Sequence, residues 1–189
     1  MGLDGILKLA NFCRVAAWRL RLALRGGRIG HRCAIAPGVR LECGRGRPIV
    51  LGEGVRLQRG VVLSTAAGGR ITLESRVYVG EYGIVRSAAE ICIARDTIIA
   101  PHVHIEDFVA ANATPEGSPL AADPIHIGRD VWFGAGVRVL GGVTVGDQAV
   151  LGAGAVADQS VPERGVAIGV PARVVRFRGA SPEKGKAPA

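Results

Sequence analysis

Two histidines and an aspartate in the segment IIAPHVHIED are the residues of this chain best suited to move a proton. They are His102, His104 and Asp107. A neutral imidazole accepts a proton near pH 7, so histidine is the side chain most often used as a general base. The competing interpretation is a solvated histidine at a surface corner. Both interpretations stay open for His104, which we favour over His102 because it lies nearer to the irregular segment that follows.

A six-residue repeat must position these side chains. From Ile125 to Val156 the sequence reads IHIGRDVWFGAGVRVLGGVTVGDQAVLGAGAV, and an aliphatic or aromatic residue returns at every sixth place. That series is Ile127, Phe133, Val139, Val145 and Leu151, and a second apolar series stands two places earlier at Ile125, Val131, Val137 and Val143. A unit this short cannot bury its apolar side alone, so successive units must wind and stack. The repeat therefore predicts an all-β solenoid of parallel strands.

Glycine directly follows four of the five residues in the first series, at Gly128, Gly134, Gly146 and Gly152. A side chain at such a corner would collide with the next coil, and glycine also tolerates backbone angles that are closed to other residues. Either property would explain these glycines.

The repeat, closed by the segment GVPAR at residues 169–173, resembles the hexapeptide-repeat acyltransferases. The branch concerned holds the maltose and galactoside O-acetyltransferases and the acetyltransferases of bacterial polysaccharide synthesis. The resemblance is strongest over residues 124–176 and continues in phase over residues 29–107. It implies a left-handed parallel β-helix of triangular section, assembled as a homotrimer with acyl-CoA bound between neighbouring subunits.

The resemblance also implies a reaction, the transfer of an acyl group from acetyl-CoA or another acyl-CoA to a hydroxyl of a sugar or polysaccharide precursor. A sugar hydroxyl hardly ionises at neutral pH, so a neutral histidine must take its proton. Here the chain departs from the family, because the position of the catalytic histidine falls on Ala110 or near Phe108, and the family's asparagine one coil earlier falls near Gly80. We therefore expect either an O-acetyltransferase that uses His104, His102 and Asp107, or a catalytically impaired homologue that serves as a scaffold or binding partner.

The cofactor side of the family pattern carries over without a gap from Trp132 to Arg176. The resemblance places Ala135 near the thioester, Ala153 and the pair Asp158-Gln159 along the pantetheine groove, and Arg173 and Arg176 at the nucleotide phosphates. Trp132 either flanks the acyl end of the groove or packs on a neighbouring subunit. Asp158-Gln159 stands where many relatives carry Thr-Lys, which predicts weakened CoA affinity.

A metal-dependent solenoid is the third class of function that we consider. The chain has only four histidines, His31, His102, His104 and His126, and they lack the ligand spacing of that class. The four cysteines, Cys13, Cys33, Cys43 and Cys92, form no CxxC pair. We expect no metal site and no disulfide, and we expect His126 to be a surface strand residue.

Residues 1–26 predict an amphipathic basic helix. Apolar residues recur at three- and four-residue intervals from Leu3 to Leu24, and Arg14, Arg19 and Arg21 interrupt any run long enough to cross a membrane. The helix either caps the open end of the solenoid or lies on an anionic membrane, and both uses would bury the same apolar stripe.

The solenoid domain is expected over residues 27–178. Two glycine-rich stretches, at residues 43–48 and 66–70, predict widened corners. The period stops over residues 108–123, which predicts a functional loop thrown out of the solenoid, and residues 179–189 predict a flexible tail.

The formal net charge of +8 comes from Lys and Arg scattered through the repeat corners. Such scatter is untypical of nucleic-acid binding, where basic residues gather with aromatic residues on one face. We expect no nucleic-acid partner, but rather anionic small molecules or an anionic membrane. The reduced cysteines and the lack of a signal peptide favour a cytoplasmic protein, peripheral to the membrane if the first helix binds lipid.

Overall fold

The computed structural model describes residues 3–44, 46, 48–66, 68–108 and 122–179, with side chains from residue 9 onward. It consists of helix α1 (Leu3–Ala23) followed by three sheets. The first sheet comprises β1 (Arg28–Ile29), β4 (Ile49–Leu51), β7 (Arg70–Leu73), β10 (Glu90–Ile93), β13 (Ile125–Ile127) and β16 (Thr144–Val145). The second comprises β2 (Ala34–Ile35), β5 (Arg56–Leu57), β8 (Tyr78–Val79), β11 (Ile98–Ile99), β14 (Trp132–Phe133), β17 (Val150–Leu151), β19 (Gly165–Ile168) and β20 (Arg173–Phe177). The third comprises β3 (Arg40–Glu42), β6 (Val62–Thr65), β9 (Ile84–Ser87), β12 (His104–Glu106), β15 (Arg138–Val139) and β18 (Val156–Ala157).

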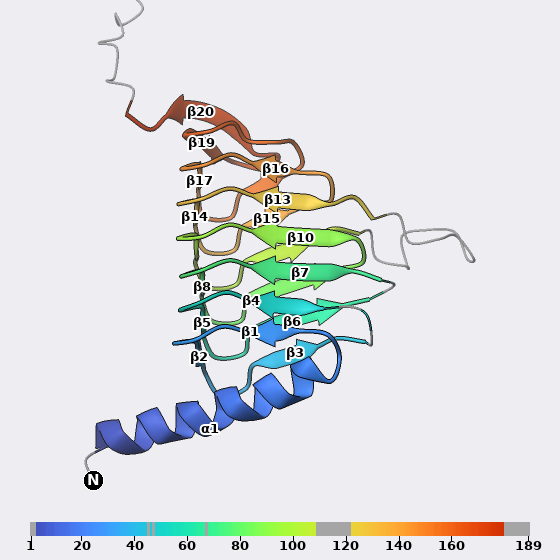
Figure 1. Ribbon diagram of the computed structural model, residues 1–189. Coiled ribbons are helices and arrows are strands. Elements are labelled where there is room, and N and C mark those ends of the chain that lie inside the picture. Colours follow the sequence, from blue (N-terminus) through green and yellow to red (C-terminus); the bar gives the residue numbers. More distant parts are fainter. Residues whose placement is uncertain (1–2, 45, 47, 67, 109–121, 180–189) are drawn as a thin grey trace, which may run out of the picture.

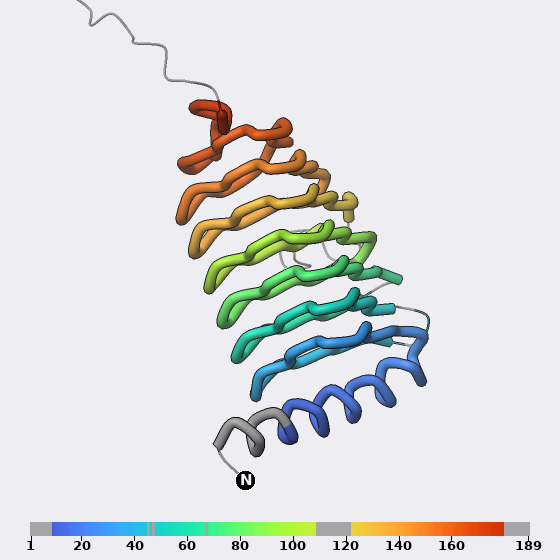
Figure 2. Tube along the Cα trace, turned by 60° about the vertical axis from the view of Figure 1, so that its left-hand side comes forward, coloured from blue at the N-terminus to red at the C-terminus, as the bar shows by residue number. Residues whose placement is uncertain are grey.

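From β1 to β18, consecutive strands enter the three sheets in turn, so three strands complete one coil and the coils stack along one axis (Figures 1 and 2). Strands of successive coils pair in parallel, and only the terminal pair of β19 and β20 is antiparallel among the strands that the structure describes. The predicted fold, a parallel β-helix with an N-terminal helix, is confirmed.

The core is the inside of the solenoid. All residues of the two predicted apolar series are buried, and Phe133 and Leu151 are completely enclosed. Strands alternate between buried and outward residues, as in Arg138–Val139, where only the valine is buried. Each hexad therefore contributes its aliphatic side chains to a single continuous core.

Coil length varies at one corner of the triangle. The register shows this, because Val50 pairs with Thr72 in an early coil, whereas Trp132 pairs with Val150 in a later and shorter one. The extra residues lie between the third sheet and the first, where both widened corners were predicted. The predicted loop leaves at this same corner, and an antiparallel bridge between Phe108 and Ala122 closes its root. Residues 109–121 of that loop and residues 180–189 of the predicted tail lie outside the described residues.

The corner glycines serve close approach rather than unusual backbone angles. A Cβ on Gly134 would lie 2.5 Å from the backbone N of Ala153, and one on Gly146 would lie 2.4 Å from the backbone N of Glu163. These two glycines do not adopt positive φ. The left-handed conformation occurs two residues further on from Gly134, at Gly136, with a φ of 70°. Of the two explanations for the corner glycines, only the steric one holds.

Helix α1 lies across the first coil and covers the end of the solenoid (Figure 1). Its polar side chains face the coil: Arg14 Nε donates to the Ile35 carbonyl at 2.7 Å, and Arg19 Nη2 donates to the Gly30 carbonyl at 2.6 Å. Asn11 Oδ1 accepts from the Ile35 amide at 3.0 Å. These groups pair backbone atoms that a preceding coil would otherwise have paired.

The helix therefore caps the solenoid, but not through the predicted apolar stripe. Only Val15 and Leu22 of its described side chains are buried, while Leu20, Leu24 and Cys13 of the stripe are exposed. The expectation that capping and membrane binding would bury the same face is wrong, because the first coil requires hydrogen-bonding groups at its open edge. No helix among the described residues is long and apolar enough to cross a membrane.

Candidate functional site

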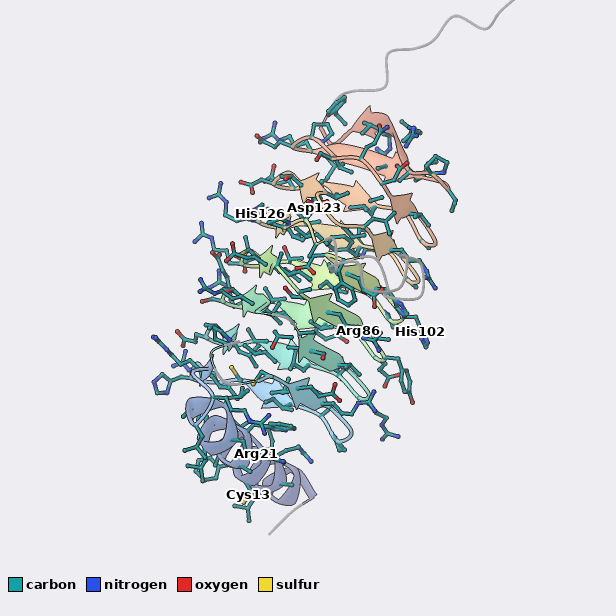
Figure 3. All side chains as sticks on the ribbon, turned by 90° about the vertical axis from the view of Figure 1, so that its right-hand side faces the viewer. Cys13, Arg21, Arg86, His102, Asp123 and His126 are labelled. Carbon is teal, nitrogen blue, oxygen red and sulfur yellow. The ribbon has the colours of Figure 1, made fainter. Side chains whose placement is uncertain are left out.

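His102 occupies a tight corner between the second and third sheets. Its backbone φ is 60°, and Tyr82, one coil below at the equivalent corner, has a φ of 55°. The two rings stack with centroids 5.4 Å apart and an interplanar angle of 9°. Figure 3 shows His102 projecting from the edge of the solenoid, where its side chain is exposed. Stacking fixes the orientation of the ring without burying its nitrogens.

His104 begins β12 in the third sheet and points outward between Ile84 of the coil below and Arg138 of the coil above. Its side chain is half-buried. Burial and, second, the positive charge of Arg138 lower the pKa of His104 below its usual value, against the opposing effect of Glu106. The imidazole is therefore neutral at pH 7, which is the state that a general base requires.

Asp107 is completely buried and held by three donors. Ser87 Oγ donates to its carboxylate at 2.6 Å, and the amides of Ala88 and Ala89 donate at 2.7 and 3.1 Å. Its carbonyl accepts from the amide of Asp123 at 2.8 Å, across the root of the extruded loop. These contacts suit Asp107 to positioning the loop root, because a buried carboxylate that already accepts from three donors is poorly placed to take a proton from substrate.

Above His102, the same corner of the next two coils carries only small residues. Ala135-Gly136 and Ala153-Gly154 stack directly on each other, with the Gly136 amide donating to the Pro101 carbonyl at 3.0 Å and the Gly154 amide donating to the Ala135 carbonyl at 2.8 Å. Apart from the adjacent residues of the chain, no atom lies within 4 Å of where a Cβ of Gly136 or Gly154 would be. We call Ala135, Gly136, Ala153 and Gly154 the bare corner column.

The two sides of the bare corner column differ in polarity. Trp132 and Val150 project from the second sheet on one side, and the indole of Trp132 is 56% exposed. Arg138 and Val156 project from the third sheet on the other side. A slender chain lying along the column would meet apolar surface on one side and a cation close to His104 on the other.

Two of the residues predicted at the CoA phosphates or along the groove pair with each other. Arg173 Nη1 donates to Asp158 Oδ1 at 2.9 Å, and both side chains are largely exposed. Arg176 lies exposed on β20, and Gln159 is exposed just after β18. The aspartate found where relatives carry threonine thus neutralises an arginine that was expected to contact phosphate.

The structure brings His102, His104 and the bare corner column together, with Trp132 on one rim. The Arg173–Asp158 pair joins β20 to the end of β18, in the coil that also holds Ala153 and Gly154. His126 lies exposed on β13 in the first sheet, on the opposite side of the solenoid in Figure 3, as a surface strand residue. Ala110, one of the two positions expected for the family's histidine, lies outside the described residues. A side chain at Gly80 would meet the backbone of Ala100 at 2.7 Å, so a family-type asparagine has no room there.

Sequence reasoning missed Tyr82, Ser87 and Arg138. Each is the partner, one coil away, of a residue that was singled out: Tyr82 of His102, Ser87 of Asp107, and Arg138 of His104. In the first two pairs the separation along the chain equals the local coil length, so counting one coil back would have found both.

Among the described residues, no cluster of three or more His, Cys, Asp or Glu side chains is arranged to hold a metal ion. The described cysteines are all free thiols, and Cys33 and Cys43 are buried in the first coil.

Known proteins resemble this chain in sequence. Residues 124–157 match the family described as bacterial transferase hexapeptide (six repeats). The chain is 32% identical over 139 residues to the putative lipopolysaccharide biosynthesis O-acetyl transferase WbbJ of Escherichia coli K12, covering 68% of this chain and 71% of that protein.

Solved structures share the fold. An N-acyltransferase of Bacillus cereus, AntD, crystallised with dTDP and coenzyme A, superimposes with a TM-score of 0.69 at 18% identity, covering 79% of this chain and 83% of that one. A hexapeptide-repeat acetyltransferase of Vibrio cholerae O1 biovar eltor, crystallised with acetyl-coenzyme A, superimposes with a TM-score of 0.58 at 25% identity, covering 87% and 77%. The repeat, the solenoid and the likeness to WbbJ over most of both chains show that this protein belongs to the hexapeptide-repeat acyltransferase family.

Proposed function

We propose that the protein transfers an acetyl group from acetyl-CoA to a hydroxyl of a sugar or glycan precursor. The observation that carries the proposal is the bare corner column beside His104, a half-buried histidine whose lowered pKa keeps it neutral. The likeness to WbbJ, a putative lipopolysaccharide biosynthesis O-acetyl transferase, supports the acceptor class, and the acetyl-coenzyme A bound to the Vibrio protein supports the donor.

The small corners suit a pantetheine arm. Because Gly136 and Gly154 present no side chains, a slender ligand can approach the backbone along the column. Ala135 would then lie near the thioester, and Ala153 and Gln159 would lie along the pantetheine arm. Arg173 and Arg176 would lie near the nucleotide phosphates, because guanidinium groups bind phosphate well. Trp132 would flank the acyl end.

His104 would act as the general base. Its imidazole takes the proton of the acceptor hydroxyl while that oxygen attacks the thioester carbonyl. The tetrahedral intermediate then collapses to the acetyl ester, the carbon–sulfur bond breaks, and the CoA thiolate takes the proton from the imidazolium. His102, which Tyr82 holds in place at the same end of the column, is the second candidate for this role.

A homotrimer is part of the proposal, because the column is open on one side. Exposed apolar side chains follow one another up the second sheet, at Ile98 on β11 and Trp132 on β14, and a neighbouring subunit packed there would supply the missing wall.

The test is direct. The protein is incubated with acetyl-CoA labelled in the acetyl group and a panel of sugars, nucleotide sugars and polysaccharide fragments, and transfer is followed by mass spectrometry and by thiol release. Acetylated acceptor that depends on His104 is the expected result. Binding of acetyl-CoA by calorimetry with no transfer to any acceptor would contradict enzymatic function.

That last outcome defines the second candidate, a family member that binds but does not turn over. One observation favours it: the two positions expected for the family's catalytic histidine are occupied by Phe108 and Ala110. General-base assistance is typically worth about 10²–10⁴-fold, so its loss would leave a binding protein. Ala110→His restores the family's residue, and a gain of activity in this variant over an inactive wild type would establish the scaffold interpretation.

A further inference from the structure

The outer face of α1 is apolar, although this helix ends the solenoid and faces away from it. Leu9, Phe12, Leu20 and Leu24 are 53, 67, 67 and 74% exposed, and the smaller side chains between them are exposed as well (Ala10, Cys13, Ala16, Ala17 and Ala23). Figure 3 shows Cys13 on the side of α1 that faces away from the strands. Residues 9–23 of α1 span about 22 Å, so this face is an extended surface rather than a single exposed side chain.

The arrangement reverses the usual pattern of a surface helix, which buries its apolar side and exposes its polar side. In α1 the polar side chains Asn11, Arg14 and Arg19 bond the backbone of the first coil, and the apolar side chains point outward. Scattered exposed apolar residues are normal, whereas a contiguous apolar face marks a contact surface. The solenoid itself cannot cover this face because it already packs on the opposite one.

The surroundings of the face are basic. Residues 5–25 contain no acidic residue, and the segment stays basic although Arg14, Arg19 and Arg25 each donate to a backbone carbonyl of the first coil. Arg21 is exposed, with its guanidinium 5.2 Å from the centre of the Trp18 ring, and Arg28 is exposed on the adjoining β1. A groove of about 420 Å³ between α1 and the third sheet is lined by Arg21, Arg25 and Arg40, together with Glu42, which pairs with Arg40 at 3.6 Å.

We propose that this face docks the protein on an anionic membrane surface, with α1 lying in the plane of the lipid headgroups. Apolar side chains along one face enter the boundary between headgroups and acyl chains, and flanking cations contact anionic headgroups, which is how interfacial helices bind. A second copy is the poorer occupant, because this end of the solenoid exposes Arg21 and Arg28 and a second copy would bring the same positive charge to the contact, whereas anionic headgroups bring the opposite charge. The proposal does not depend on acyl transfer.

The test uses the full-length protein and vesicle flotation without acetyl-CoA. Vesicles of phosphatidylcholine are compared with vesicles containing about one third phosphatidylglycerol, at low and at physiological salt. Binding to the anionic vesicles that weakens with salt is expected. Failure to bind the anionic vesicles would overturn the membrane proposal and leave the acyltransferase proposal untouched.

The apolar contribution is tested with Phe12→Ser, Leu20→Ser and Leu24→Ser combined. These side chains are exposed, so the thermal melt should match that of the wild type, while vesicle affinity falls about tenfold or more. Leu140→Ser, which changes an apolar side chain that is 44% exposed on a solenoid corner, is the matched control and should bind like the wild type. Equal binding by the triple variant and the wild type would refute the proposal.

The charge contribution is tested with Arg21→Glu and Arg28→Glu combined, compared with Arg164→Glu and Arg178→Glu at the other end of the solenoid. Only the first pair should weaken binding to anionic vesicles. If both pairs weaken it equally, net charge alone is responsible and docking through α1 is refuted. Light scattering of the triple serine variant without lipid gives the last outcome: a halved particle mass would show that a second copy covers the face, which also overturns the proposal.

Discussion

At the scale of single residues, the chemistry depends on the protonation state of His104. The general base must be neutral, and burial together with Arg138 lowers the pKa of this histidine. The rate should therefore rise with pH through a value below the usual pKa of histidine and stay level from neutral pH upward. Measuring kcat/KM against pH checks this profile, and His104→Ala should remove most of the activity while leaving acetyl-CoA affinity intact.

Arg138→Met sharpens the same prediction. Removing the cation beside His104 favours the imidazolium, so the pKa rises and the acid limb of the profile moves to higher pH. Arg32→Met, which changes an exposed arginine of the first coil, is the control and should leave the profile in place. If Arg138→Met also leaves it in place, another group is the base, and His102→Ala is the next variant to measure.

The pairing of Asp158 with Arg173 makes a second prediction at this scale. Asp158→Asn removes an anion from the expected phosphate site and releases the guanidinium, so acetyl-CoA should bind more tightly. An exposed ion pair is worth about 0.2–1 kcal/mol, which corresponds to a gain of up to about fivefold. Calorimetry measures the gain, and Arg173→Ala with Arg176→Ala should weaken binding. If affinity is unchanged in all these variants, CoA does not use this part of the surface.

At the scale of elements, Asp107 holds the end of β12 to the preceding coil and to the root of the loop. Asp107→Ala leaves the Ser87 hydroxyl and the Ala88 and Ala89 amides without their acceptor, which should cost about 2–4 kcal/mol of stability. The neighbouring Glu106→Ala removes only an exposed contact with Arg86 and should cost less than about 1 kcal/mol. Thermal melts at one protein concentration compare the two, and equal losses would contradict a special role for Asp107.

At the scale of the whole molecule, the proposed function places a neighbouring subunit on the open side of the bare corner column. We expect a trimer by light scattering, and Trp132→Arg should dissociate it, because a cation would replace an exposed apolar side chain in the proposed contact. Leu140→Arg is the matched control and should leave the mass unchanged. A wild type that is monomeric at all concentrations would remove the intersubunit site.

The six-residue period is enough to predict the solenoid and its interior. Period six decides which side chain of each hexad turns inward, so residues such as Phe133 and Val139 could be assigned to the core, and breaks in the period located the widened corners. The CoA contacts expected from the family resemblance, by contrast, stay predictions.

Which outward residues contact one another depends on how the coils stack in three dimensions. The length of each coil is set by corners that do not follow the period, and the coil lengths in turn place Tyr82 beneath His102 and Ser87 beside Asp107. The orientation of α1 also depends on tertiary structure, because its own periodicity favours burying the apolar stripe. The first coil leaves backbone groups unpaired at its edge, and pairing them turns the polar side of the helix inward and its apolar side to the outside.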